Sequence, residues 1–240
     1  MKSSNPFALW RWEKMFGEWQ MFGEGFLLTI EVAALALILA LVLGTIFGVI
    51  STSNNKIMRG IARVYVEFFQ NTPLVIQVFF LYNGLAIAGL RLSVFLIGVL
   101  GVGIYHGAYV SEVVKAGITS IPVGQVEAAK SQGFTYVQYM RYIILPQTVK
   151  IVLPPLTNQA VNLIKNTSVL AMISGFDLMY MADSWASSSL DYGPSYVFAG
   201  FLYFMLCFPL ATWARRYEER LKRKDTTRIP FDASGEAVTC

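Results

Sequence analysis

The sequence predicts an all-α membrane protein with five transmembrane helices. Hydrophobic residues make up 55% of the chain and charged residues only 14%, against a usual charged share of about a quarter. Long uncharged runs recur, and a helix needs about 20 apolar residues to cross the hydrocarbon core. The runs do not alternate between polar and apolar residues as barrel strands do. Because lipid admits only helices and closed barrels, the runs predict helices.

The expected elements follow in chain order. Residues 1–24 form an extracytoplasmic segment, in which Trp10 to Phe22 is typical of a short helix lying in the membrane interface. Residues 25–214 form the transmembrane domain, and residues 215–240 form a basic cytoplasmic tail. The fourth span is expected to be interrupted, because Lys165 divides its apolar residues. The spans are expected at about 25–50, 64–88, 92–114, 147–180 and 193–214.

Positive charge orients these spans. With the N-terminus outside, the cytoplasmic segments hold 14 Lys and Arg residues and the outer segments hold four. Lys and Arg concentrate in cytoplasmic loops, so the bias predicts an N-out, C-in topology. The net charge of +4 then reflects topology and attraction to the inner leaflet. No nucleic-acid partner is expected.

A polar loop at about 115–146 is longer than a connection between two spans needs. The region Gln125–Ala129 favours helix, and Gly133 permits a turn or a close backbone approach. Apolar residues then recur at helical spacing, which predicts a second helix with one buried face; they are Tyr136, Tyr139, Met140, Ile143 and Ile144. The loop therefore predicts a two-helix element that docks a cytoplasmic partner, although an ordinary amphipathic connector is the alternative.

Individual residues of the loop have predicted roles. Ala128, Ala129 and Gly133 are small enough for close contact with a partner groove, and Glu127 can cap a helix or meet a basic residue. Pro146, which follows Leu145, can start the next helix because its missing N–H is not needed there.

The loop resembles the EAA loop of ABC importer permeases, in which Glu-Ala-Ala, a Gly and a Leu-Pro pair recur as they do at Glu127-Ala128-Ala129, Gly133 and Leu145-Pro146. The resemblance extends from about Gly25 to Trp213 and is closest to the polar amino acid branch. Matching stretches are Phe69–Leu74 with Gln77, Ala108–Glu112, Ile121–Gln125, Leu145–Gln147, Pro154–Asn158 and Asn162–Ser168. Two departures are Gln70, where many members carry Arg, and His106, where a small or apolar residue is expected.

The resemblance implies the type I importer (MetI-like) permease fold. Two permease subunits, identical or homologous, would pair in the lipid bilayer, and a cytosolic ABC ATPase dimer would bind at the EAA loop. An extracytoplasmic amino-acid-binding protein would deliver the substrate. ATP and Mg would be bound by the ATPase, so no cofactor is expected in this chain. The implied location is the bacterial cytoplasmic (inner) membrane.

The residues themselves support a transport role without catalysis. The chain has no phosphate-binding Gly-x-x-x-x-Gly-Lys-Ser/Thr sequence, no metal-ligand spacing and no catalytic dyad. It is therefore expected to be a transporter subunit that needs a separate ATPase. The expected cargo is a polar amino acid: glutamate, aspartate, glutamine or a basic amino acid. The alternative is an ion- or proton-coupled secondary carrier, which would need a relay of buried ionisable groups, whereas only His106 lies deep.

The cluster Lys165-Asn166-Thr167-Ser168 is the first candidate for the substrate pathway. Ionisable residues at membrane depth are costly, so they normally face a cavity or a partner. Lys165 or a helix N-terminus could meet a substrate carboxylate. Alternatively, Lys165 snorkels to the interface or pairs with Glu67 or Asp177.

A second polar break lies in span two, where Pro73 is expected to kink the helix. Its polar residues either line the pathway or satisfy the freed carbonyls; they are Gln70, Asn71, Thr72 and Gln77.

Other polar and small residues have open roles. His106 predicts an interhelical hydrogen bond, or a substrate or gate contact. Glu112 predicts a pair with Lys115 or Arg141, or a substrate contact. Asp177, Asp183 and Asp191 are either solvated or contact the binding protein. Gly44 with Gly48, and Gly103 with Gly107, permit close helix packing within the chain or between two permeases.

Overall fold

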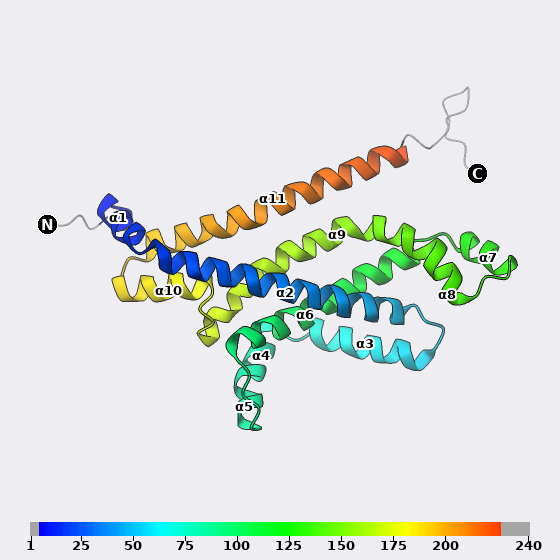
Figure 1. Cartoon of the computed structure of the whole chain (residues 1–240), viewed down its shortest axis with the longest axis horizontal. Coiled ribbons are helices and arrows are strands. Elements are labelled where there is room, and N and C mark those ends of the chain that lie inside the picture. Colours follow the sequence, from blue (N-terminus) through cyan, green and yellow to red (C-terminus); the bar gives the residue numbers. More distant parts are fainter. Residues whose placement is uncertain (1–4, 227–240) are drawn as a thin grey trace.

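The computed structural model describes residues 5–226, and this part is helical throughout. Figure 1 shows α2, α6, α9 and α11 running along the long axis, with α1 and α10 at one end and α7 and α8 at the other. The helices are α1 (Leu9–Gly17), α2 (Trp19–Ser51), α3 (Lys56–Gln70), α4 (Leu74–Phe79), α5 (Leu85–Ile87), α6 (Val94–Thr119), α7 (Val123–Ser131), α8 (Tyr136–Tyr139), α9 (Leu145–Asn166), α10 (Leu178–Ser189) and α11 (Tyr192–Thr226). Two π-helical turns, Phe80–Gly84 and Met140–Ile144, and the 3-10 helix Thr167–Ile173 link some of them.

The all-helical prediction is confirmed, but the spans are not equally apolar. In the described part of the chain α2, α6 and α11 are long and apolar enough to cross a membrane, and α3 with α4–α5 could form a fourth, bent span. Helix α9 has 22 residues but is too polar for the same criterion. Several of its polar residues line an open cavity, as described below, so α9 combines the length of a span with a polar face.

Glycines allow α2 and α6 to pack closely against each other. A Cβ atom on Gly44 would lie 2.3 Å from Val110 Cγ1, and one on Gly48 would lie 2.7 Å from Val114 Cβ. From the other helix, a Cβ on Gly103 would lie 2.8 Å from Leu39. Both small-residue pairs predicted from the sequence therefore pack helices within this chain. Of the two roles considered for them, packing within the chain and packing between two permeases, the structure shows the first.

The polar break in span two is a sharp bend. Helices α3 and α4–α5 meet at 98°, and Figure 1 shows α4 and α5 leaving the direction of the bundle. The change of direction is larger than the helix kink expected at Pro73. Three residues, Asn71 to Pro73, separate the two helices, so the whole change of direction takes place within these residues.

The interrupted fourth span is present with different limits. Helix α9 ends at Asn166 and continues as the 3-10 helix to Ile173. Ser174 and Phe176 then take left-handed backbone conformations, with φ of 56° and 55°, and α10 begins at Leu178 as a separate helix. The expected span 147–180 therefore joins parts of two helices.

At the end of the bundle that carries α1 and α10, ionic contacts hold α1 against the start of α11. Asp191 is only 2% exposed and pairs with Arg11 and with Lys14, whose Nζ lies 3.5 Å from Asp191 Oδ2. Asp177 is fully buried, whereas Asp183 is exposed and accepts a hydrogen bond from Tyr196. Asp191 and Asp177 are therefore neither solvated nor free to contact a binding protein, which corrects both roles considered for them.

Candidate functional site

A cavity of about 410 Å³ opens between α6 and α9. Its lining is polar although it lies between two membrane helices; the lining residues are Tyr105, His106, Tyr109, Gln159, Asn162, Lys165 and Asn166. They include one ammonium group, three primary amides and no carboxylate. A small zwitterionic molecule can therefore find both donors and acceptors here.

His106 and Asn166 join the two walls of the cavity. Asn166 Nδ2 lies 3.0 Å from His106 Nε2. An amide nitrogen can only donate, so with the Asn166 amide in this orientation the Nε2 atom of His106 accepts the hydrogen bond. The predicted interhelical hydrogen bond is therefore present, and it orients the Asn166 amide so that its nitrogen is engaged.

Lys165 supplies the positive charge of the cavity and is exposed. The two carboxylates suggested as its partners are engaged elsewhere: Glu67 lies 3.8 Å from Arg63, and Asp177 accepts a hydrogen bond from the Met179 N–H. The helix end at this point is the C-terminus of α9, which carries a partial negative charge. The cavity is therefore lined by the Lys165 ammonium group, and no helix N-terminus lies at this point.

The other members of the predicted pathway cluster do not line the cavity. Thr167 is fully buried and donates to the Ile164 carbonyl, and Ser168 donates to the Lys165 carbonyl. Both hydroxyls therefore stabilise the change from α-helix to 3-10 helix.

The residues of the second polar break lie apart from the cavity. Asn71 donates to the Glu67 carbonyl and Thr72 to the Phe68 carbonyl, whereas Gln77 donates to the carbonyls of Phe69 and Thr72. These bonds satisfy carbonyls that lose their helical partners at the bend.

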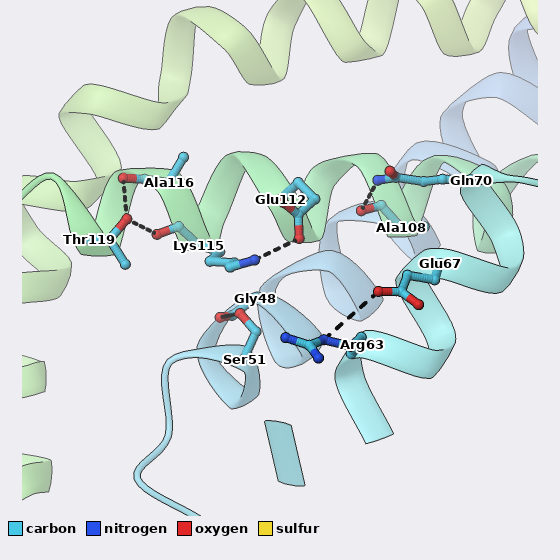
Figure 2. A network of polar contacts seen from close by, with 10 residues as sticks. All are labelled: Gly48, Ser51, Arg63, Glu67, Gln70, Ala108, Glu112, Lys115, Ala116 and Thr119. Atoms are coloured by element: carbon cyan, nitrogen blue, oxygen red, sulfur yellow. Dashed lines mark hydrogen bonds and ion pairs between the residues drawn. The ribbon is translucent and has the colours of Figure 1, made fainter. Parts of the chain in front are cut away.

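Gln70 is the last residue of α3, and Glu112 lies on α6 (Figure 2). Gln70 Nε2 donates to the Ala108 carbonyl, and Glu112 accepts from Lys115 at 3.2 Å. The pairing predicted for Glu112 is therefore confirmed.

Gln159 is a cavity residue that sequence reasoning did not single out, and Asn162 was noticed only within a matching stretch. A signal was present, because Gln159, Asn162 and Asn166 follow a spacing of three and four residues along α9. Residues at this spacing share one helix face. A polar stripe in an otherwise apolar span would have indicated the wall of a cavity.

The predicted two-helix element is present at the opposite end of α9, as α7 and α8. Gly133, with a φ of +81°, ends α7, and its N–H donates to the Lys130 carbonyl while Phe134 N–H donates to the Ala129 carbonyl. This pattern is a Schellman motif, which needs a left-handed residue and favours glycine. Thr135 then caps α8 through a capping box with Gln138.

The exposed surface of this element differs in part from the prediction. Glu127, Ala128 and Gly133 are exposed, but Ala129 is only 3% exposed because it packs inside the chain. Ala129 therefore cannot contact a partner groove. Apolar side chains add to the exposed surface instead: Val123, Val137 and Tyr142 are 69%, 70% and 64% exposed.

The second helix of the element runs into α9 without a break, from Tyr136 to Asn166. Pro146 lies in the first turn of α9, as predicted, but Leu145 and Pro146 follow the π-helical turn Met140–Ile144 instead of a loop. Gln147 Nε2 donates to Gln125 Oε1 of α7 at 2.7 Å. Both helices of this two-helix element are thus attached to the helix that lines the cavity.

Within residues 5–226, no group of three or more His, Cys, Asp or Glu side chains is placed to hold a metal ion.

Comparisons with known proteins agree with this arrangement. Residues 40–223 match the family described as binding-protein-dependent transport system inner membrane component. The probable glutamine ABC transporter permease protein GlnM of Bacillus subtilis is 42% identical over 209 residues, which span 87% of this chain and 97% of that protein. The arginine transport system permease protein ArtQ of the same organism is 30% identical and spans 84% of this chain and 93% of that protein.

Among solved structures, the chain is likewise similar to ABC transporters. A crystal structure of an amino acid ABC transporter with histidines has a TM-score of 0.80 and 31% identity, covering 87% of this chain and 98% of that one. An inward-facing MetNI methionine ABC transporter has a TM-score of 0.67 at 15% identity, covering 84% and 98%; at this identity it supports the fold alone. The resemblance found in the sequence is thereby confirmed, and the chain belongs to the family of binding-protein-dependent transport system inner membrane components.

Proposed function

We propose that this chain is the permease subunit of an ABC importer for a polar amino acid, with glutamine as the first candidate. The observation that carries the proposal is the α6–α9 cavity, which offers one cation and three amides at membrane depth. The relatives support the substrate class, since GlnM is named for glutamine and ArtQ for arginine.

The chemistry of the cavity favours glutamine among these candidates. Lys165 can bind the α-carboxylate, and the amides of Gln159 and Asn162 can both donate to and accept from an amide side chain. An arginine or lysine side chain would meet the like charge of Lys165 without a carboxylate to balance it. A glutamate side chain would need a second cation.

The energy would come from other subunits. We infer that a cytosolic ABC ATPase dimer docks on α7 and α8, that ATP and Mg bind there, and that a second permease and an extracytoplasmic binding protein complete the importer. When the ATPases close on ATP, they would displace α7 and α8. Because α8 continues into α9, the displacement would reach the cavity and change the side from which it is open.

Reconstitution tests the proposal. The chain would be placed in proteoliposomes with its ATPase and binding protein, and uptake of labelled glutamine would be measured. We expect uptake only with ATP and Mg on the ATPase side, and competition by unlabelled glutamine but not by arginine. Uptake that follows a proton or sodium gradient without ATP would instead establish a secondary carrier.

A further inference from the structure

The pair of His106 and Asn166 fixes one amide group in the wall of the α6–α9 cavity. Both residues line this cavity, and Asn166 Nδ2 lies 3.0 Å from His106 Nε2. Two neighbouring residues of the lining, Asn162 and Lys165, are exposed. Asn166 is half-buried, and one end of its amide group is held by a partner on the opposite helix.

The imidazole of His106 is itself held in place by packing. His106 is 2% exposed, and its ring packs against those of Tyr105 and Tyr109, with centroids 5.3 Å and 6.2 Å away. The two tyrosine hydroxyls lie 3.1 Å from each other, which restricts both of these rings. A ring that is locked by its neighbours keeps its Nε2 atom in one place, so it orients the amide that binds there.

The other ring nitrogen indicates what a histidine contributes at this position. His106 Nδ1 is buried and has no hydrogen-bond partner in the part of the chain that the structure describes. A buried polar atom without a partner costs stability, and a phenylalanine ring would fill a similar space without that cost. The contact that distinguishes histidine from an apolar ring here is therefore the hydrogen bond to Asn166.

The end of the Asn166 amide that is left for a ligand is its carbonyl oxygen. Nδ2 is directed to the imidazole, and no donor within residues 5–226 contacts Oδ1, which remains accessible. The cavity lining contains no carboxylate. A ligand that carries an ammonium group must therefore use uncharged acceptors in this cavity, and Asn166 Oδ1 is an acceptor whose direction is fixed.

We propose that His106 is a positioning residue, which keeps Asn166 Oδ1 turned toward the cavity to accept a hydrogen bond from the α-ammonium group of the transported amino acid. The carboxylate and ammonium groups of an α-amino acid share one carbon atom, so they bind neighbouring groups of the protein. Lys165 for the carboxylate and Asn166 for the ammonium group meet this condition, since they are consecutive residues at the end of α9 and both line the cavity. This assignment rests on the proposed function and adds a requirement for a free α-amino group.

The test compares glutamine with a ligand in which only the α-ammonium group is replaced by hydrogen. Equilibrium binding of both ligands would be measured on the purified permease–ATPase complex, without the binding protein. We expect the wild type to prefer glutamine by roughly 10- to 100-fold, because a hydrogen bond to a charged group is lost with the deaminated ligand. In His106→Phe this preference should fall roughly 3- to 10-fold, because the freed amide must be ordered when glutamine binds.

Two further variants show whether His106 acts through Asn166. His106→Gln supplies an amide oxygen that can accept from Asn166 Nδ2, so it should restore much of the preference. Asn166→Leu removes the carbonyl oxygen itself, and combining it with His106→Phe should change the preference no further. The preference is a ratio of two affinities measured on the same sample, so partial loss of folded protein does not alter it.

An unchanged preference in His106→Phe would overturn the proposal, and so would a further loss when His106→Phe is added to Asn166→Leu. Equal binding of the two ligands by the wild type would overturn it while leaving the importer function intact. His106→Phe could instead lose discrimination against glutamine whose α-carboxylate is converted to a carboxamide. That result would mean that the amide nitrogen faces the cavity, and it would overturn the assignment too. Absence of ATP-driven glutamine uptake by the wild type would overturn the proposed function, and this assignment with it.

Discussion

Replacing Lys165 with Met removes the positive charge from the α6–α9 cavity and keeps a long, unbranched side chain. A hydrogen bond to a charged group contributes about 1.5–3 kcal/mol, and each 1.4 kcal/mol is a tenfold change in affinity. Lys165 is exposed, and the two carboxylates suggested as its partners are engaged elsewhere, so no folding interaction should be lost with its charge. We therefore expect the affinity for glutamine to fall about 10- to 100-fold, with uptake reduced and assembly with the ATPase unchanged.

The measurement is equilibrium binding of labelled glutamine to the purified permease–ATPase complex, without the binding protein. Lys150→Met is the matched control, because Lys150 is an exposed lysine of the same helix that does not line the cavity. A second ligand, glutamine whose α-carboxylate is converted to a carboxamide, allows a double-mutant cycle with one change in the protein and one in the ligand. If Lys165 binds the carboxylate, the wild type should bind the carboxamide much more weakly than glutamine. Lys165→Met should bind the two ligands with nearly equal affinity. Wild-type affinity in the variant, or an undiminished preference for the free carboxylate, would refute the assignment.

Three further changes test the packing, the docking surface and the coupling. Gly44→Val would place a Cβ 2.3 Å from a valine of α6, and overpacking costs about 1–3 kcal/mol. We expect earlier aggregation on heating, whereas Gly200→Val, at a position with nothing within 4 Å, should behave as the wild type. Gly133→Asp adds a charge to the docking surface at a left-handed position, so the ATPase should be lost in a pull-down with the tagged chain; retention of the ATPase would move the docking surface elsewhere. Gln147→Leu breaks the bond to α7, so uptake should fall several-fold while ATP hydrolysis persists; parallel changes in both would contradict a coupling role.

The sequence predicted the helical class and the positions of most spans because uncharged runs and caps are local properties. Two helices extend beyond the expected spans. The span expected at 193–214 lies within α11, which reaches Thr226, because Arg, Lys and Glu are good helix formers outside lipid as well. Similarly, α2 begins at Trp19 instead of near Gly25, since the interfacial segment is itself helical.

The site was predictable only in part. Lys165 and Asn166 were found because charge and amides are conspicuous at membrane depth, and His106 because it is the single histidine of the chain. Their assembly into one cavity depends on the register between α6 and α9, which no local pattern specifies. The 98° turn after α3 was underestimated for the same reason: Pro73 indicates a break, but tertiary contacts set its angle.

The continuous helix from Tyr136 to Asn166 has a consequence for how such a chain can change by insertion and deletion. It is about 45 Å long at 1.5 Å per residue, and each residue advances its face by about 100°. One residue inserted between Pro146 and Gln159 would leave both ends of the helix folded. It would rotate the amide stripe of Gln159, Asn162 and Asn166 by about 100° relative to α7, so the stripe would no longer face His106. Four residues would nearly restore the phase and lengthen the helix by about one turn. The number of residues in this helix therefore sets the orientation of the cavity wall relative to α7 and α8. The identity of the residues along its middle matters less for that orientation.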